Sequence, residues 1–140
     1  MATYVISDIH GQYDMFIELL DKIQFQNTDT LYILGDILDR GPHPIKTLMK
    51  FMEMPNVICI VGNHEYMALE CLEFLMKEIT DMSIEELDEK MLDNLVTWQY
   101  NGSKSTINEF RQLDSETRRD VIDFITVSYT HLRAHETRSN

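Results

Sequence analysis

The stretch Gly35-Asp36-Ile37-Leu38-Asp39-Arg40-Gly41 directly follows the apolar run Thr30–Leu34, which has the composition of a buried strand. Ionised Asp and Arg side chains are costly to bury unless they are paired or bind a metal ion. Two carboxylates and a guanidinium at the end of a buried strand therefore indicate a functional site and not a part of the core.

Two further predicted strands end in the same kind of chemistry. Thr3–Ile6 runs into Ser7-Asp8-Ile9-His10-Gly11, and the apolar run 57–61 leads into Gly62-Asn63-His64-Glu65. Carboxylate, imidazole and amide side chains suit divalent ions of borderline hardness, such as Mn, Fe or Zn, and not a cysteine-rich structural zinc site. Three strand ends with such side chains predict one shared metal centre.

Helical patterns separate the three strands. Apolar residues recur with a helical period over 12–24 and again after Pro44, and short turns link both segments to the strands. This alternation is typical of a parallel sheet with right-handed crossovers, whose ligands bind at the carboxyl ends of the strands. All three polar stretches lie at such ends. Further helices are predicted downstream, over 65–79, 83–96, 106–113 and 116–125.

The composition restricts the class of protein. A chain of 140 residues suits one domain. A formal net charge of −12 argues against a nucleic-acid partner, because phosphate backbones attract Lys and Arg. The sequence shows no apolar stretch long enough to span a membrane and no secretory signal, so we expect a cytoplasmic protein without a membrane partner. Cys59 and Cys71 fit reduced core residues better than a disulfide. Nothing in the sequence indicates the oligomeric state.

The three polar stretches resemble, in order and spacing, the first three motifs of the metallophosphoesterases. Within that family they are most similar to the PPP-type serine/threonine protein phosphatases, especially short bacterial and phage members, and the resemblance covers about residues 1–125. It implies an α/β fold: a parallel βαβαβ start followed by helices, which forms the N-terminal half of a β-sandwich flanked by helices.

The resemblance also implies a centre with two divalent metal ions. Asp8 and His10 would bind the first ion, Asp36 would bridge the two, and Asn63 would bind the second. Manganese is the expected metal, with iron and zinc as alternatives.

Three further residues receive catalytic roles by resemblance. Arg40 would hold the phosphate oxygens, His64 would protonate the leaving group, and Asp39 would orient His64. The implied reaction is attack of a metal-bridging hydroxide on the phosphate of a phosphoprotein or a small phosphoester. The residues themselves leave other readings open: Asp39 and Arg40 as a simple loop ion pair, and His64 as a structural histidine. Glu65 is expected to be structural, at the start of a helix.

Some features depart from the family pattern. Ser7 replaces a usual Gly, and Val61 stands where several relatives carry an Arg. The family's later His ligands for the second metal, and a further phosphate-binding Arg, have no match. We therefore expect residues 1–126 to form a truncated metallophosphoesterase domain with an incomplete second metal site and weak or no activity. Residues 127–140 are expected to be a non-native or disordered tail, a genuine polar tail being the alternative.

Two other functions remain open. Symmetrical bis(5'-nucleosyl)-tetraphosphatases have similar motifs but tend to carry Asp after Gly-Asn-His and to lack the Asp before Arg. Glu65 and Asp39 therefore favour the protein phosphatase. A non-catalytic module that binds a metal or a partner is the third possibility.

Overall fold

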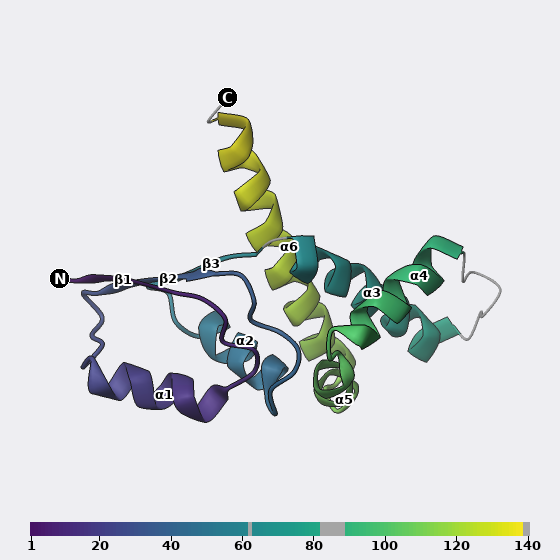
Figure 1. Cartoon of the computed structure of the whole chain (residues 1–140), viewed down its shortest axis with the longest axis horizontal. Helices are drawn as coiled ribbons and strands as arrows, with labels where there is room; N and C mark the ends of the chain where they lie inside the picture. The colour runs from purple at the N-terminus through teal and green to yellow at the C-terminus, as the bar shows by residue number, and fades with distance from the viewer. Residues whose placement is uncertain (62, 82–88, 139–140) are drawn as a thin grey trace.

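The computed structural model describes the backbone of residues 1–61, 63–81 and 89–138, and the side chains of 1–61, 65–76 and 89–128. A three-stranded parallel sheet forms one part of the molecule, and four helices follow it along the chain (Figure 1). The predicted α/β class, with its parallel start and helical continuation, is confirmed.

The sheet contains β1 (Thr3–Ile6), β2 (Thr30–Leu34) and β3 (Val57–Ile60) in the order β1-β2-β3. Both strand pairs are parallel. The crossovers are α1 (Tyr13–Lys22) and α2 (Pro44–Met52), and Figure 1 places both on the same side of the sheet. When successive crossovers have the same handedness and the strands are added in one direction, the connecting helices lie on the same face of the sheet.

Burial alternates along β2, as it does in a strand with one covered face. Leu31 and Ile33 are almost fully buried and belong to the same apolar cluster as Phe16 of α1. Val5 and Leu34, on the opposite face of the sheet, are 58% and 47% exposed. The first half of the core therefore lies between the sheet and its two crossover helices.

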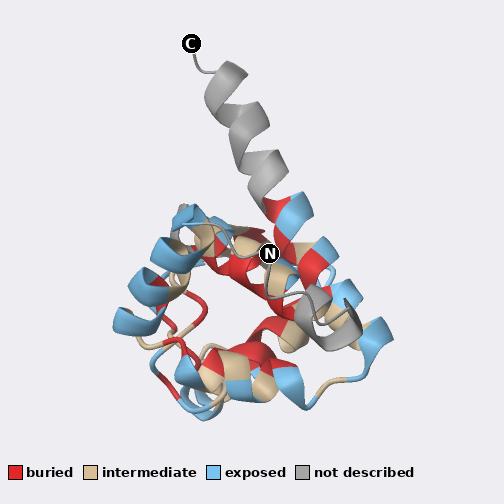
Figure 2. Cartoon of the chain, turned by 90° about the vertical axis from the view of Figure 1, so that its right-hand side faces the viewer, coloured by how far each residue is buried: buried red, intermediate tan, exposed pale blue. Residues whose placement is uncertain are grey.

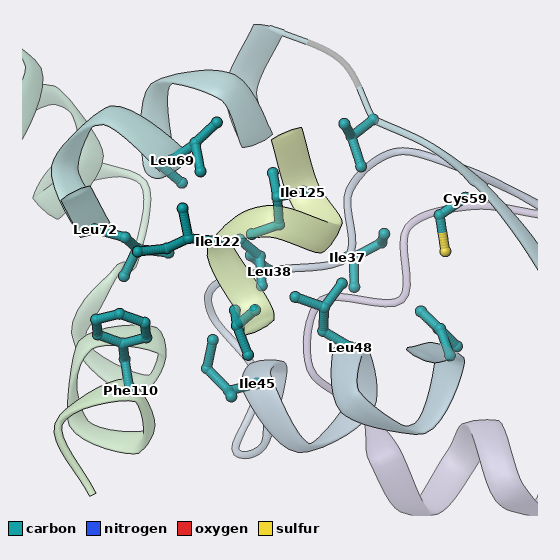
Figure 3. Close-up of a cluster of buried hydrophobic side chains, with 14 of the residues drawn as sticks. Ile37, Leu38, Ile45, Leu48, Cys59, Leu69, Leu72, Phe110, Ile122 and Ile125 are labelled. Atoms are coloured by element: carbon teal, nitrogen blue, oxygen red, sulfur yellow. The ribbon is translucent and has the colours of Figure 1, made fainter. Parts of the chain in front are cut away.

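The second half of the core is helical. It is formed by α3 (Asn63–Asp81), α4 (Glu89–Tyr100), α5 (Lys104–Arg111) and α6 (Ser115–Arg138). The first part of α6 packs against α3, α2 and β3 and so joins the two halves. Figure 3 shows the side chains that meet there: Leu69, Leu72, Phe110, Ile122 and Ile125. Figure 2 shows the buried residues on the inner sides of the helices and the exposed ones outside.

The last helix is longer than the sequence predicts. It begins after Asp114, whose carboxylate accepts the N–H of Thr117 at 2.7 Å, as an N-cap does. It then continues through the proposed domain boundary at residue 126 to Arg138. The assignment of 127–140 as a tail stays a prediction, and the start of the predicted helix 83–96 lies outside the described residues.

Two smaller expectations can be compared with the structure. Cys59 and Cys71 are both buried free thiols, as predicted. Among the described residues, no helix combines the length and apolar character needed to cross a membrane.

Candidate metal centre

The loops after β1 and β2 bring three predicted ligands together. Asp8 and Asp36 each lie two residues beyond their strand, and His10 follows in the first loop. One ligand atom from each of Asp8, His10 and Asp36 lies within 4.8 Å of the others. This is a group of donors that could hold a divalent metal ion.

An unusual backbone shapes both loops. Five of the six described non-glycine residues with positive φ are predicted site residues; their φ values are 58° for Asp8, 43° for His10, 52° for Asp36, 75° for Asp39 and 72° for Arg40. A left-handed conformation is unfavourable by about 1–2 kcal/mol for an L-residue. Such conformations concentrate where a site depends on them.

These left-handed residues explain how the first pair of ligands meets. Asp8 and His10 would diverge if they continued a regular strand, and the sequence suggests a turn only at Gly11. In the structure β1 ends at Ile6, and the turn is distributed over Asp8, His10 and Gly11, all with positive φ.

Hydrogen bonds hold the first loop against the second. The N–H of His10 donates to the carbonyl oxygen of Asp36 at 3.0 Å, and the N–H of Gly11 donates to that of Ile37 at 2.9 Å. Gly41 lies so close to the first loop that a Cβ there would overlap the carbonyl oxygen of His10. The two ligand-bearing loops therefore form one interlocked unit.

The orientation of His10 suits a metal ligand. Its Nδ1 is 3.1 Å from the carbonyl oxygen of Leu38. A carbonyl oxygen only accepts, so Nδ1 is the donor of this bond, and in the neutral ring the lone pair is then on Nε2. Nε2 lies 3.9 Å from Oδ1 of Asp8. Metal-binding histidines commonly have their second nitrogen fixed in this way.

A cavity of about 190 Å³ opens over these side chains. Its lining is mostly polar and, among the residues that the structure describes, includes Asp8, His10, Asp36, Leu38, Asp39, Arg40, Glu65 and Asn101. It combines carboxylates that can attract cations with the guanidinium of Arg40, which can attract an anion.

The carboxylate of Asp39 accepts hydrogen bonds from two distant parts of the chain. The indole Nε1–H of Trp98 donates to both oxygens, at 3.0 and 2.8 Å, and the hydroxyl of Thr106 donates to Oδ1 at 2.6 Å. Burial raises the pKa of Asp39, and the hydrogen bonds from Thr106 and Trp98 oppose this effect. The ion pairs of the described residues include none between Asp39 and Arg40, so the simple ion-pair reading is not supported.

The third strand end is described only in part. Asn63 and His64 lie in the first turn of α3, and their side chains are outside the described part of the chain. Their roles as metal ligand and general acid stay predictions, as does the orienting role of Asp39. Glu65 is 5% exposed and accepts the N–H of Ile37 at 3.2 Å. It thereby joins α3 to the loop after β2, in agreement with the structural role expected for it.

Three residues near the site were not identified from the sequence. Trp98 and Thr106 bind Asp39, and Asn101 lines the cavity. The sequence shows a turn at Asn101-Gly102 but gives no reason to connect it with the strand ends. Two signals were available: the resemblance to the metallophosphoesterases includes the region from Trp98 to Thr106, and Trp98, the only tryptophan of the chain, lies just before this turn.

Comparison with known proteins identifies the family. A family model described as calcineurin-like phosphoesterase matches residues 1–134. The chain belongs to this family. Its members use divalent metal ions, and the group formed by Asp8, His10 and Asp36 in this calcineurin-like phosphoesterase is consistent with that use.

The chain is similar to several curated relatives. Symmetrical bis(5'-nucleosyl)-tetraphosphatases of Salmonella paratyphi A, Salmonella paratyphi B and Salmonella newport are each 43% identical to it over 67 residues. The match covers 46% of this chain and 24% of each relative. The matched part of the chain therefore spans about a quarter of the length of these proteins.

Proposed function

We propose that this chain forms the metal- and phosphate-binding part of a metal-dependent phosphoesterase. The observation that carries the proposal is that Asp8, His10 and Asp36 meet in the same cavity as Arg40. Cation ligands next to an exposed guanidinium can bind a phosphate group and its metal partners at the same time. Membership of the calcineurin-like phosphoesterase family supports this proposal.

The residues present fit a divalent metal ion. Two carboxylates and an oriented imidazole are suitable donors for Mn, Fe or Zn, and we propose manganese as the resident metal. Asn63 would add an amide oxygen for a second ion. When bound, such ions supply Lewis acidity and a nucleophile at neutral pH.

The residues of the chain itself would orient the substrate. Arg40 would bind phosphate oxygens through its planar guanidinium, which matches their geometry and offsets the charge that develops during transfer. His64 would deliver a proton to the leaving oxygen, and Asp39 would orient His64.

The preferred substrate class is a phosphoserine or phosphothreonine side chain, or another small phosphomonoester. The presence of Asp39 before Arg40, with its carboxylate at the cavity, supports this choice. A dinucleoside tetraphosphate is the second candidate. The names of the similar Salmonella proteins support it.

Metal binding is the direct test of the proposed site. Isothermal titration of the chain with Mn²⁺ should show binding, and Asp36→Asn should weaken it at least about tenfold. Asp14→Asn is the matched control, because Asp14 is an exposed carboxylate on α1 outside the cavity, and it should change the affinity less than about twofold. Equal affinities of the wild type and Asp36→Asn would contradict the proposal.

Substrates can then be compared on the Mn²⁺-loaded chain. A phosphoserine peptide should displace inorganic phosphate from the site at a lower concentration than diadenosine tetraphosphate does. The reverse order would favour the second candidate. We also expect p-nitrophenyl phosphate to be hydrolysed slowly or not at all, because the second metal site is predicted to be incomplete. Rapid manganese-dependent hydrolysis would show that this last prediction is wrong.

A further inference from the structure

The segment 98–106 runs from the last turn of α4 into the first turn of α5 and is called the α4–α5 segment. It contacts Asp39 and Arg40, which together form one corner of the cavity, through both backbone and side chains. The N–H of Arg40 donates to the carbonyl oxygen of Gly102 at 2.9 Å, and the N–H of Asp39 donates to the hydroxyl oxygen of Thr106 at 3.1 Å. The donors of these two bonds are the consecutive left-handed residues of the corner.

Thr106 binds Asp39 twice. Its hydroxyl oxygen accepts the backbone N–H of Asp39, and its hydroxyl proton is donated to the Asp39 carboxylate at 2.6 Å. This closed arrangement fixes the backbone and the side chain of one residue relative to each other. Thr106 is fully buried, so water does not compete for its hydroxyl.

Trp98 supplies the second donor to the Asp39 carboxylate. It is 1% exposed, and its only polar atom, Nε1, points its proton between the two oxygens of Asp39. Held by these two donors, the carboxylate has a fixed position at the wall of the cavity and is not part of the group formed by Asp8, His10 and Asp36.

Gly102 allows the close approach that the backbone bond requires. Its φ is +88°, and a Cβ at this position would come within 2.9 Å of Cγ of Arg40 and 3.4 Å of its Cα. The backbone of this turn therefore packs against the stem of Arg40 and sets the direction in which the guanidinium leaves the chain.

We infer that Trp98 and Thr106 are positioning residues that hold Asp39 and, through it, aim Arg40 at the phosphate. This inference rests on the proposed function, since it takes phosphate as the anion that Arg40 binds. It assigns to the α4–α5 segment a role in the chemistry of a site whose other residues come from the strand ends.

The test compares Thr106→Val with Thr106→Ser. Valine has nearly the same shape as threonine but no hydroxyl, whereas serine keeps the hydroxyl. Titration of the Mn²⁺-loaded chain with inorganic phosphate should show a loss of affinity of about tenfold in Thr106→Val and nearly wild-type affinity in Thr106→Ser. Trp98→Phe, which keeps a ring but lacks the indole N–H, should resemble Thr106→Val. The Mn²⁺ affinity should change less than about twofold in all three variants, because none of them alters a proposed ligand.

A second measurement separates this inference from the proposed function. Because Trp98 is the only tryptophan, the intrinsic fluorescence of the chain reports on the neighbourhood of Asp39. Thr106→Val should shift the emission maximum, and Thr106→Ser should restore it. If Thr106→Val matches the wild type in both phosphate affinity and emission, the inference is overturned. If the wild type binds Mn²⁺ but no phosphate, the proposed function fails, and the emission of the Val and Ser variants alone decides whether Thr106 positions the corner.

Discussion

Gly41→Ala is the substitution that most directly tests how the two ligand loops interlock. An added Cβ would overlap the carbonyl oxygen of His10 and lie 2.9 Å from the carbonyl carbon of Gly11 and 3.0 Å from that of His10. All three atoms are backbone, so no flexible side chain can move aside. The first loop would have to move away from the second, which carries Asp36, and its hydrogen bonds to that loop would be strained.

The expected cost exceeds that of an ordinary overpacking substitution. Such changes reduce the free energy of unfolding by about 1–3 kcal/mol when side chains can partly adjust. With rigid backbone on the far side, we expect at least about 3 kcal/mol, the upper end of that range. For a slope of about 1.5 kcal/mol per M of urea, this corresponds to a midpoint about 2 M lower.

Gly35→Ala provides the matched control. Gly35 has a φ of +68°, so alanine would be strained there by about 1–2 kcal/mol. Its added Cβ, however, would find its nearest neighbours at 3.8–3.9 Å, which is ordinary contact. Gly35→Ala therefore measures the cost of a left-handed alanine without overlap, and Gly41→Ala measures the cost of overlap.

Urea unfolding followed by the fluorescence of Trp98 gives both values in one assay. Gly41→Ala should lower the midpoint about twice as far as Gly35→Ala, and a chain that remains folded should bind Mn²⁺ more weakly because His10 is displaced. A midpoint for Gly41→Ala equal to or above that of Gly35→Ala would refute the interlocked loops.

Three other predictions concern the remainder of the fold. The backbone N–H groups of Gln26 and Ala2 donate to Asp29 and lower its pKa. The ionised carboxylate therefore stabilises the fold above about pH 4, and this stabilisation is lost as the pH falls through the lower pKa of the folded state. In Asp29→Asn, the urea midpoint should decrease less between neutral and acidic pH than it does in the wild type. Burial raises the pKa of the thiols of Cys59 and Cys71 to about 12, so neither should react with Ellman's reagent at pH 8 until urea unfolds the chain. Phe110→Ala should reduce the free energy of unfolding by about 3–5 kcal/mol because the ring is fully buried, whereas Val127→Ala, at a 68% exposed position, should change it by less than about 0.5 kcal/mol; similar losses in the two variants would argue against the described core.

The sheet was predictable because its determinants are local. Each strand is a short apolar run that ends at polar residues, and the bounds of Thr3–Ile6 and Thr30–Leu34 agree with the sequence reading. The convergence of Asp8 and Asp36 was also predictable, since both follow neighbouring parallel strands at the same edge.

The partners of Asp39 were not predictable in this way. Trp98 lies 59 residues from Asp39 in the sequence, and Thr106 lies 67 residues away. Their contact depends on how α4 and α5 pack, and no periodicity in either segment indicates this. Helical patterns show which side of a helix is apolar, but they do not show which loop its last turn will meet.

The left-handed backbone of the site explains why the distant segment is needed. A single left-handed residue costs about 1–2 kcal/mol, and five of them together are a large fraction of the 5–15 kcal/mol by which a domain is usually stable. For Asp8, His10 and Asp36 the compensation is close by, in the hydrogen bonds between the first two loops and the contact with Gly41. Asp39 and Arg40 instead donate their N–H groups to Thr106 and Gly102. The proposed cation ligands are thus supported by the sheet edge, whereas Asp39 and Arg40, the proposed phosphate-binding side of the cavity, depend on helices far along the chain. Because the two supports are separate, substitutions in the α4–α5 segment should impair phosphate binding while leaving metal binding intact.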